Sequence, residues 1–339
     1  MSQAPLIGQP GPLNLLTDVP GIWVGQSEDH HLKTGVTVVT GPERLVASVN
    51  VMGGAPGTRE TDLLMPDKIV ESVDALVLSG GSAIGLDAAG GVVDALREQG
   101  KGYVVGPVTV PLVPAAIIFD LLSGGQHAVD TNPYRALGRE ALFRADTDFV
   151  LGSAGAGTGA TTATLKGGVG SASLVLANGC TVGALVVANP HGSVVSPDGH
   201  FYAAPFEYGE EFGGRGMHAG DSALRVQPSE KLAAFNAKAN TTIAIVATDA
   251  SLNKAQCQRL ATSAQDGMAR AIVPSHTPFD GDLVFGVSTE RRTLSDPVTD
   301  TLLLGHAAAI CLTRAIARGV YCADTADHDI LPTWQARFG

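Results

Sequence analysis

The chain has 339 residues, of which 45% are apolar and only 5% aromatic, so we expect a substantial core built from small aliphatic side chains. The formal net charge of −11 argues against nucleic acid and anionic membranes as partners, because both bind basic surfaces. Four scattered cysteines without zinc spacing are expected to be free thiols in a reducing compartment. The first residues lack a signal peptide's basic and apolar regions. We therefore expect a soluble cytoplasmic protein with no metal and no cofactor.

The first half of the chain predicts strands, a glycine-rich turn and a helix. Gly35–Thr40 and Leu45–Val51 are β-rich runs separated by Gly-Pro-Glu-Arg, a pattern typical of a hairpin. Ala75–Leu78 is a buried strand that enters the glycine-rich stretch 79–85, and a helix to Gln99 follows. This arrangement exposes backbone N–H groups at a helix N-terminus, where an anion or oxyanion can bind. The same glycines also suit close packing of a helix on a strand, and both interpretations stay open.

The middle of the chain predicts two buried strands separated by an irregular segment. Thr181–Ala188 and Thr242–Thr248 are rich in Val, Ile and Thr, which fit a pleated buried surface. Between them, Pro205–Lys238 loses periodicity, and its glycines and charges are typical of a mobile surface segment. A mobile segment here is what a processed precursor needs, and it is also what any long loop looks like.

The last third of the chain predicts two helices around a strand. A helix is expected from a cap at Asp249 or Ser251 to about Ile272, followed by a strand at Leu283–Ser288. Asp296–Gly319 is expected as a buried helix, with a capping aspartate and a proline at its start. Helix pairs alternating with strands, without an evident linker, indicate α/β layers in one domain spanning 1–339.

Three polar features stand at the edges of predicted strands: Asn189, Thr241 and the sequence Asp280-Gly281-Asp282. A threonine hydroxyl is a weak nucleophile and needs a base. If the chain were cut between Asn240 and Thr241, the new α-amine, with a reference pKa of about 7.7–8.0, would suit that task. An asparagine amide can donate to an oxyanion, and paired carboxylates can accept from a terminal residue. Each feature also has a plain structural explanation as a strand start or a turn.

A lone charge, Lys166, lies in the glycine-, alanine- and threonine-rich stretch Gly152–Gly170. It is either a solvated lysine or a charge placed at a site. The sequence shows no intact Gly-x-Ser-x-Gly motif, and its nine histidines lack metal-ligand spacing, so a serine triad and a zinc hydrolase are unsupported.

Five segments follow one another in a recognisable order along the chain: 59–64 (Arg-Glu-Thr-Asp-Leu-Leu), 78–89 (Leu-Ser-Gly-Gly-Ser-Ala-Ile-Gly-Leu-Asp-Ala-Ala), 187–190 (Val-Ala-Asn-Pro), 240–243 (Asn-Thr-Thr-Ile) and 280–285 (Asp-Gly-Asp-Leu-Val-Phe). Together they make the chain resemble, over nearly its whole length, the L-aminopeptidase/D-amidase-esterase family of self-processing hydrolases. That family includes β-peptidyl aminopeptidases and endo-type nylon-oligomer (6-aminohexanoate oligomer) hydrolases.

The resemblance implies a four-layer αββα sandwich similar to that of N-terminal-nucleophile hydrolases. It also implies a precursor cut at Asn240–Thr241 into an α chain, 1–240, and a β chain, 241–339. Several such αβ units are expected to form a homo-oligomer. The implied activity is hydrolysis of amide bonds by an aminopeptidase or amidase.

The resemblance also suggests a role for each matching residue. Thr241 corresponds to the nucleophile and Asn189 to the oxyanion-binding asparagine. Asp280 and Asp282 fall on positions that contact the hydroxyl and the amine of the nucleophile, and Lys166 matches a lysine near the site in the nylon-oligomer branch.

Two further positions concern the substrate. Phe119 stands where some relatives have a tyrosine whose hydroxyl helps the reaction, and phenylalanine cannot donate that hydrogen bond. The adjacent Asp120 is a candidate for binding a substrate ammonium group.

The expected substrates are short peptides or amino-acid amides and esters with a free N-terminus. A hydrolase of 6-aminohexanoate oligomers is the first alternative. An N-acetylornithine-type acyltransferase is a second, although its cut usually follows Lys-Gly and not Ala239-Asn240. An uncleaved, non-enzymatic small-molecule binding protein is the third.

Overall fold

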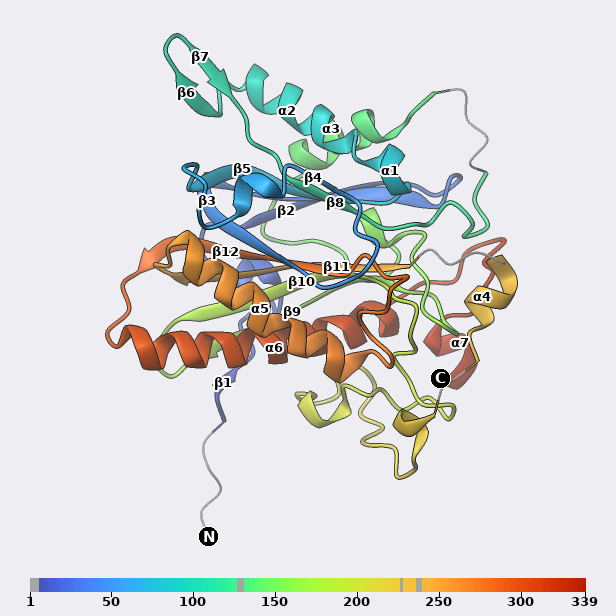
Figure 1. Cartoon of the computed structure of the whole chain (residues 1–339). Helices are drawn as coiled ribbons and strands as arrows, with labels where there is room; N and C mark the ends of the chain where they lie inside the picture. The colour runs from blue at the N-terminus through green and yellow to red at the C-terminus, as the bar shows by residue number, and fades with distance from the viewer. Residues whose placement is uncertain (1–5, 127–130, 226–227, 236–239) are drawn as a thin grey trace.

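Two β-layers pack face to face and are covered on their outer faces by helices, as the computed structural model of the chain shows (Figure 1). The structure describes residues 6–126, 131–225, 228–235 and 240–339. Its strands are β1 (Gly8–Gln9), β2 (Trp23–Asp29), β3 (Thr34–Val51), β4 (Thr58–Arg59), β5 (Ser72–Ser79), β6 (Tyr103–Val105), β7 (Val108–Val110), β8 (Ala115–Ile117), β9 (Gly168–Leu176), β10 (Thr181–Asn189), β11 (Thr241–Ala250) and β12 (Leu283–Arg292). Its α-helices are α1 (Ser82–Gly85), α2 (Ala88–Glu98), α3 (Tyr134–Phe143), α4 (Glu230–Phe235), α5 (Lys254–Ala271), α6 (Pro297–Tyr321) and α7 (Trp334–Phe338).

The long strand β3 belongs to both β-layers. Strands are hydrogen-bonded in the order β1-β9-β10-β11-β12-β3-β5-β8-β4, and β2 also pairs with β3. The first part of β3 pairs with β5, whereas residues 46–51 pair with β12. The register shifts between Thr40 and Leu45, where β3 passes from one layer to the other.

The hairpin predicted for residues 35–51 is therefore wrong, because both runs form one strand of eighteen residues. Gly41-Pro42-Glu43-Arg44 forms an irregularity within it and not a reversal. A proline is tolerated at such a bulge because it need not donate to the ladder.

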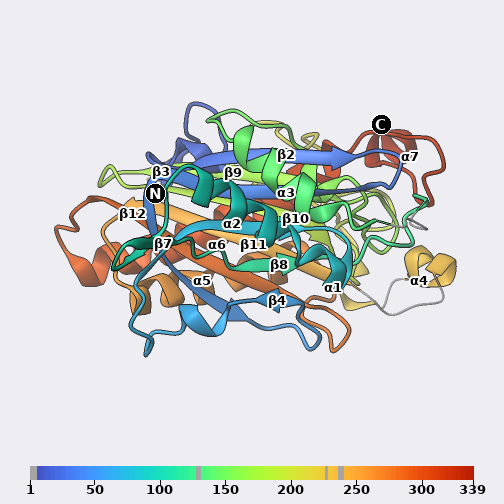
Figure 2. The same cartoon turned by 90° about the horizontal axis from the view of Figure 1, so that it is seen from above.

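Three hydrophobic clusters separate the four layers. One lies between the two sheets and includes Leu76, Leu185, Ile245 and Phe285. A second lies under α5 and α6, and a third under α2 and α3. Seen from above in Figure 2, α2 and α3 lie across the front of the strands. Each central strand contributes alternate side chains to two of these clusters, as expected for strands buried on both faces. The predicted four-layer αββα architecture is confirmed.

The predicted elements are present, with some different boundaries. Helix α5 begins at Lys254 after Asn253, whose side chain accepts the N–H of Gln256, so the expected caps at Asp249 or Ser251 are wrong. Asp249 lies within β11, which continues to Ala250, and Ser251 directly follows the end of that strand. Helix α6 has the predicted cap at Asp296 and runs two residues beyond Gly319.

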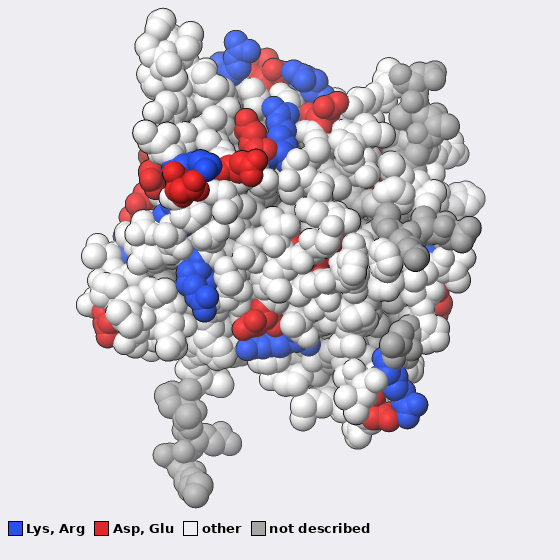
Figure 3. Space-filling model, in the orientation of Figure 1, with Lys and Arg blue, Asp and Glu red and all other residues white. Residues whose placement is uncertain are grey.

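Among the described residues, α6 is the one helix that is long and apolar enough to span a bilayer, and most of it is buried inside the protein. On the face shown in Figure 3, acidic and basic side chains lie beside one another, and much of that face is formed by other residues. Ion pairs such as Arg135–Asp94 and Arg139–Glu98 join α3 to α2.

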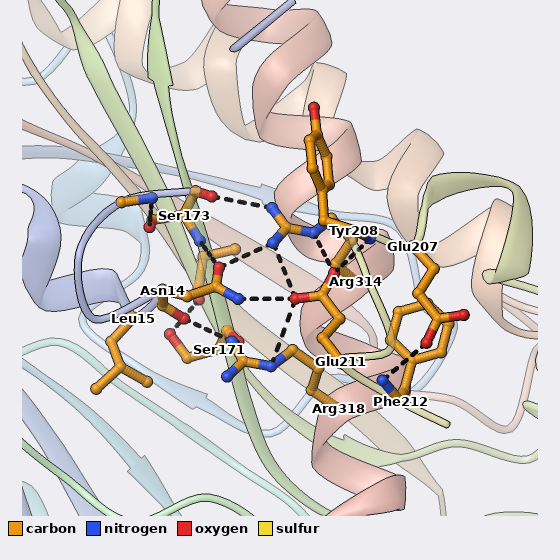
Figure 4. A network of polar contacts seen from close by, with 12 residues as sticks. Asn14, Leu15, Ser171, Ser173, Glu207, Tyr208, Glu211, Phe212, Arg314 and Arg318 are labelled. Atoms are coloured by element: carbon orange, nitrogen blue, oxygen red, sulfur yellow. Dashed lines mark hydrogen bonds and ion pairs between the residues drawn. The ribbon is translucent and has the colours of Figure 1, made fainter. Parts of the chain in front are cut away.

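The segment predicted as a mobile surface loop is anchored at several points. Phe212 is buried, and Glu211 pairs with Arg314 of α6 inside a polar network (Figure 4). Lys231 is also buried. The expectation of a surface segment is therefore wrong at these positions, because side chains far apart in the sequence supply its partners. Residues 226–227 and 236–239 of this segment lie outside the described residues.

Candidate active site

The candidate site lies where the inter-sheet core ends, at the start of β11. Thr241 is the first residue of β11 and stands directly opposite Asn189, the last residue of β10. Further along the same strands, Val187 and Ile243 point into the inter-sheet core. Because side chains alternate along a strand, Asn189 and Thr241 lie on that same face, one step beyond the apolar layer. The alternation thus brings two predicted site residues together at the edge of the core.

The Asn240–Thr241 peptide is buried, with both residues less than 5% exposed. The carbonyl oxygen of Asn240 accepts the backbone N–H of Gly281 at 3.0 Å and also the hydroxyl of Thr241. The hydroxyl therefore lies against the carbonyl of the bond predicted to be cut. A backbone donor on that carbonyl is the kind of group that stabilises an oxyanion as charge develops.

Gly281 lies close to the Thr241 side chain. A Cβ at residue 281 would stand 2.7 Å from Thr241 Oγ1 and 2.8 Å from the carbonyl oxygen of Ala55. Glycine is therefore required here by close approach, and its N–H reaches the Asn240 carbonyl without obstruction.

The Asn189 carboxamide is held on both sides. Its Oδ1 accepts the backbone N–H of Thr161 and the ammonium of Lys231, each at 3.0 Å. Its Nδ2 donates to the carbonyl of Phe119 at 3.3 Å, which connects β10 to the opposite sheet. Among the contacts of the described residues, the second Nδ2 proton has no acceptor. The backbone of Phe119 thus contributes to the site, and a role of its ring in substrate binding stays a prediction.

Lys231 is the residue that sequence reasoning missed. It lies on α4 with its side chain fully buried, and its Nζ donates to the carbonyl of Thr161 at 2.9 Å and to Asn189. Burial lowers its pKa from 10.5 to about 7, against an opposing effect of the negative charge of Asp280. Its neighbours Glu230 and Leu232 are typical of an exposed helix start, so no local pattern singles it out.

The two aspartates order the loop beside Thr241. Asp282 Oδ1 accepts a hydrogen bond from the backbone N–H of Thr242 at 2.7 Å, and Asp282 Oδ2 is hydrogen-bonded to Nδ1 of the His276 ring at 3.0 Å. Asp280 Oδ1 accepts the N–H of His191 at 2.9 Å. Burial, followed by the charge of Asp282, raises the pKa of Asp280 above its ordinary value.

Among the contacts of the described residues, neither carboxylate is hydrogen-bonded to the Thr241 hydroxyl. Their predicted contacts with the hydroxyl and free amine of a terminal threonine stay predictions, since that amine exists only after a cut.

Lys166 is connected to the site through Thr161, whose backbone N–H contacts Asn189. Its Nζ donates to both oxygens of Asp329, at 2.9 and 3.1 Å, and to the carbonyl of Asp324 at 2.7 Å. The same Asp329 also pairs with Lys33 at 2.7 Å. An isolated bridge joins the backbones of Lys166 and Thr161, whose N–H reaches Asn189. Lys166 is therefore a placed, buried charge and not a solvated lysine.

Asp120 closes the glycine-rich turn after β5. Its carboxylate accepts the N–H of Gly81 at 2.7 Å and the hydroxyl of Thr34 at 2.6 Å. The backbone donor expected to bind an anion thus binds this carboxylate. Burial raises the pKa of Asp120 to about 6 despite both hydrogen bonds. Both oxygens are engaged and the residue is fully buried, so a substrate ammonium has no direct access to it in this form.

No group of three or more His, Cys, Asp or Glu residues within the described parts of the chain is arranged to hold a metal ion.

Two β-layers stacked between helices, with this polar cluster at one end, match the fold of solved aminopeptidases, one of which is described as a variant of the N-terminal-nucleophile (Ntn) hydrolase fold. The β-aminopeptidase of Burkholderia sp. superimposes with a TM-score of 0.68 at 26% identity, covering 98% of this chain and 94% of that one. The L-aminopeptidase D-Ala-esterase/amidase of Ochrobactrum anthropi, described as a new variant of the Ntn-hydrolase fold, gives a TM-score of 0.68 at 24% identity, covering 96% and 92%.

A model of Peptidase family S58 matches residues 14–329, and the chain belongs to this family. It is 43% identical to an uncharacterized aminopeptidase of Mycobacterium tuberculosis over 96% of this chain and 98% of that protein. It is 29% identical to the 6-aminohexanoate-oligomer endohydrolase of Kocuria sp. over 82% of this chain and 75% of that protein. The protein is a peptide-bond hydrolase.

Proposed function

We propose that the protein is a self-cleaving amide hydrolase in which Thr241 becomes the N-terminal nucleophile of a 241–339 chain. The observation that carries this proposal is the arrangement around the Asn240 carbonyl, which the Thr241 hydroxyl and the Gly281 N–H both contact. A buried threonine hydroxyl beside the preceding carbonyl, with a backbone donor on the same oxygen, suits attack on that carbonyl.

The cut follows from an N-to-O acyl shift. Thr241 Oγ1 attacks the Asn240 carbonyl carbon, the C–N bond breaks as the C–O bond forms, and the hydroxyl proton passes to the Thr241 nitrogen. Water then hydrolyses the ester, which leaves a carboxylate on Asn240 and a free hydroxyl and amine on Thr241.

In the cleaved enzyme, nucleophile and base belong to one residue. The Thr241 amine accepts the hydroxyl proton as Oγ1 attacks a substrate amide, and Asn189 Nδ2 donates to the developing oxyanion. The protonated amine then gives its proton to the leaving amine, and water hydrolyses the acyl ester. Asp282 contributes by holding the Thr242 N–H, which fixes the chain directly behind the nucleophile.

The protein is proposed to act as an aminopeptidase. Its proposed substrates are short peptides or amino-acid amides and esters with a free N-terminus. The aminopeptidases among the relatives support this class. Endo-hydrolysis of 6-aminohexanoate oligomers is a second candidate, favoured by the relatives that carry that activity in their names. Assembly of several αβ units into a homo-oligomer and a cytoplasmic location stay predictions.

A substrate panel tests the activity. We expect the purified protein to release product from amino-acid amides or 6-aminohexanoate oligomers, and Thr241→Ala to lose at least about 10³-fold in kcat, because the nucleophile is removed. Thr242→Val is the matched control: the Thr242 hydroxyl is buried and has no hydrogen-bond partner among the described residues, so its loss should leave turnover intact. Turnover by Thr241→Ala at the unmodified rate would refute the proposal.

A further inference from the structure

Lys231 is a buried lysine whose described hydrogen bonds all end on uncharged oxygens. Its Nζ donates to Thr161 O at 2.9 Å, to Asn189 Oδ1 at 3.0 Å and to Asn189 O at 3.2 Å, and lies 3.5 Å from Pro190 O. Burying a lysine without a paired counter-charge is costly, because its ammonium group loses its hydration. The position of this lysine therefore calls for a role beyond stability.

That role concerns the Asn189 side chain. A carboxamide can adopt two orientations, which differ by exchange of its oxygen and its NH₂ group. In the observed orientation, Oδ1 faces two donors, the Lys231 ammonium and the Thr161 N–H. A flip would turn the Nδ2 hydrogens toward both donors and lose both bonds. Lys231 thus fixes which end of the amide faces away from α4.

The free end of that amide lies next to Thr241. Asn189 and Thr241 are direct partners on neighbouring antiparallel strands, so their side chains leave the sheet on the same face. Nδ2 uses one proton on the carbonyl of Phe119, and its other proton is available to an oxyanion formed at Thr241.

We propose that Lys231 is a positioning residue, which holds the Asn189 carboxamide so that Nδ2 donates to the oxyanion in both the self-cleavage and the substrate reaction. This inference rests on the proposed function of Thr241. Lys231 and the oxygens that it contacts all belong to 1–240, so the cut at residue 241 leaves the contacts in place. Helix α4 therefore stays docked as a part of the mature site.

Lys254 provides a matched control for a purely structural lysine. It is 2% exposed, and its Nζ donates to the carbonyls of Leu63, Lys68 and Val70. Leu63 belongs to η2 (Asp62–Leu64), and Lys68 and Val70 lie between η2 and β5. Lys254 makes no described contact with the site residues. Lys254→Met removes a buried ammonium from three carbonyls without touching Asn189.

The test compares Lys231→Met, Lys231→Gln and Lys254→Met, with kcat and KM measured separately and kcat normalised to the fraction of split chains. Lys231→Met should lower kcat by about 10²-fold, the effect of losing one oxyanion donor, with KM within about twofold. Lys231→Gln keeps an uncharged donor and should recover part of kcat. Lys254→Met should change thermal stability but leave kcat within about twofold.

A double-mutant cycle separates positioning from a general structural effect. Asn189→Ala should lower kcat or the rate of chain splitting about as much as Lys231→Met, and the double variant should be no slower, because both changes remove the same donor. Additive effects would overturn the proposal, as would unchanged kcat in Lys231→Met. If Lys231→Met does not fold, Lys231→Gln decides: a kcat at least about threefold below the unmodified value supports the proposal, and an unchanged kcat overturns it. A failure of Thr241 itself is recognised separately, by turnover or chain splitting in Thr241→Ala.

Discussion

Gly281 shows how closely the site is packed around the proposed nucleophile. Its missing side chain leaves room for Thr241 Oγ1, and its N–H holds the Asn240 carbonyl. An added methyl group would meet the hydroxyl on one side and the backbone of Ala55 on the other. Backbone cannot move aside as a flexible side chain can, so the hydroxyl must shift.

We expect Gly281→Ala to slow chain splitting by at least about tenfold, because displacing reacting atoms by about 1 Å can cost about 10²-fold in rate. The fraction of split chain over time, measured by denaturing electrophoresis, reports this rate. Gly90→Ala on α2 is the control, since its new Cβ would approach closely the exposed, flexible end of the Arg135 side chain and would meet Arg59 Nη1 at an ordinary contact distance of 3.9 Å. Equal splitting rates for the two variants would contradict this view of Gly281.

The residues of the site were predictable to different degrees. Thr241, Asn189 and the Asp280–Asp282 pair were singled out because each polar group interrupts or borders an apolar strand, and the structure places them at one end of neighbouring strands. Lys231 was not predictable, because its burial depends on Thr161 and Asn189, which lie far from it in the sequence. The ion pair of Lys166 with Asp329 depends on a similarly distant contact.

At the scale of elements, a polar network attaches helix α6 to two irregular segments. Arg314 of α6 has a fully buried side chain and donates to both oxygens of Glu211, at 2.6 and 2.9 Å, and to Asn14 Oδ1 at 2.8 Å (Figure 4). Burial alone raises the pKa of Glu211, but the hydrogen bonds and charge of Arg314 outweigh it and keep the net pKa below its ordinary value. The network anchors the segment that leads toward the cut.

Removing the charge of Glu211 leaves the positive charge of Arg314 buried without its negatively charged partner. We expect Glu211→Gln to lower the free energy of unfolding by about 3–5 kcal/mol at neutral pH, measured by urea denaturation. Glu210→Gln is the matched control, because Glu210 is the neighbour of Glu211 in the sequence and is exposed.

The pH dependence gives a second readout of the same variant. A carboxyl with a depressed folded-state pKa contributes stability above its unfolded pKa, and this contribution is lost as the pH falls through the folded value. The stability difference between the unmodified protein and Glu211→Gln should therefore shrink below about pH 4.3, the reference value for Glu. A difference that is constant between pH 7 and pH 3 would contradict the assignment.

Elements were predicted best where one sequence signal dominates. The strand that became β10 and the helix that became α6 follow from a β-branched run and from a capping aspartate with proline, respectively. The hairpin at 35–51 failed because local turn residues were outweighed by pairing with two different partner strands. The surface segment failed because Glu211 and Phe212 find partners only in the assembled fold.

At the scale of the whole molecule, the site depends on the stacking of two sheets. Thr241 and Asn189 come from one β-layer, whereas the Phe119 carbonyl comes from just after β8, a strand of the other layer. Composition and periodicity indicate α/β layers, but the four-layer αββα arrangement required the resemblance to known hydrolases. Non-local pairing, such as the parallel contact of β11 with β12, has no signature in a single sequence.

The measurement that tests the central claim most directly is the intact mass of the purified protein, combined with N-terminal sequencing. The account predicts two fragments, one of which begins at Thr241, and a single 34.6 kDa chain for Thr241→Ala. A Thr241→Ala protein that still separates into the two fragments, or an unmodified protein that remains one 34.6 kDa chain while active, would contradict it.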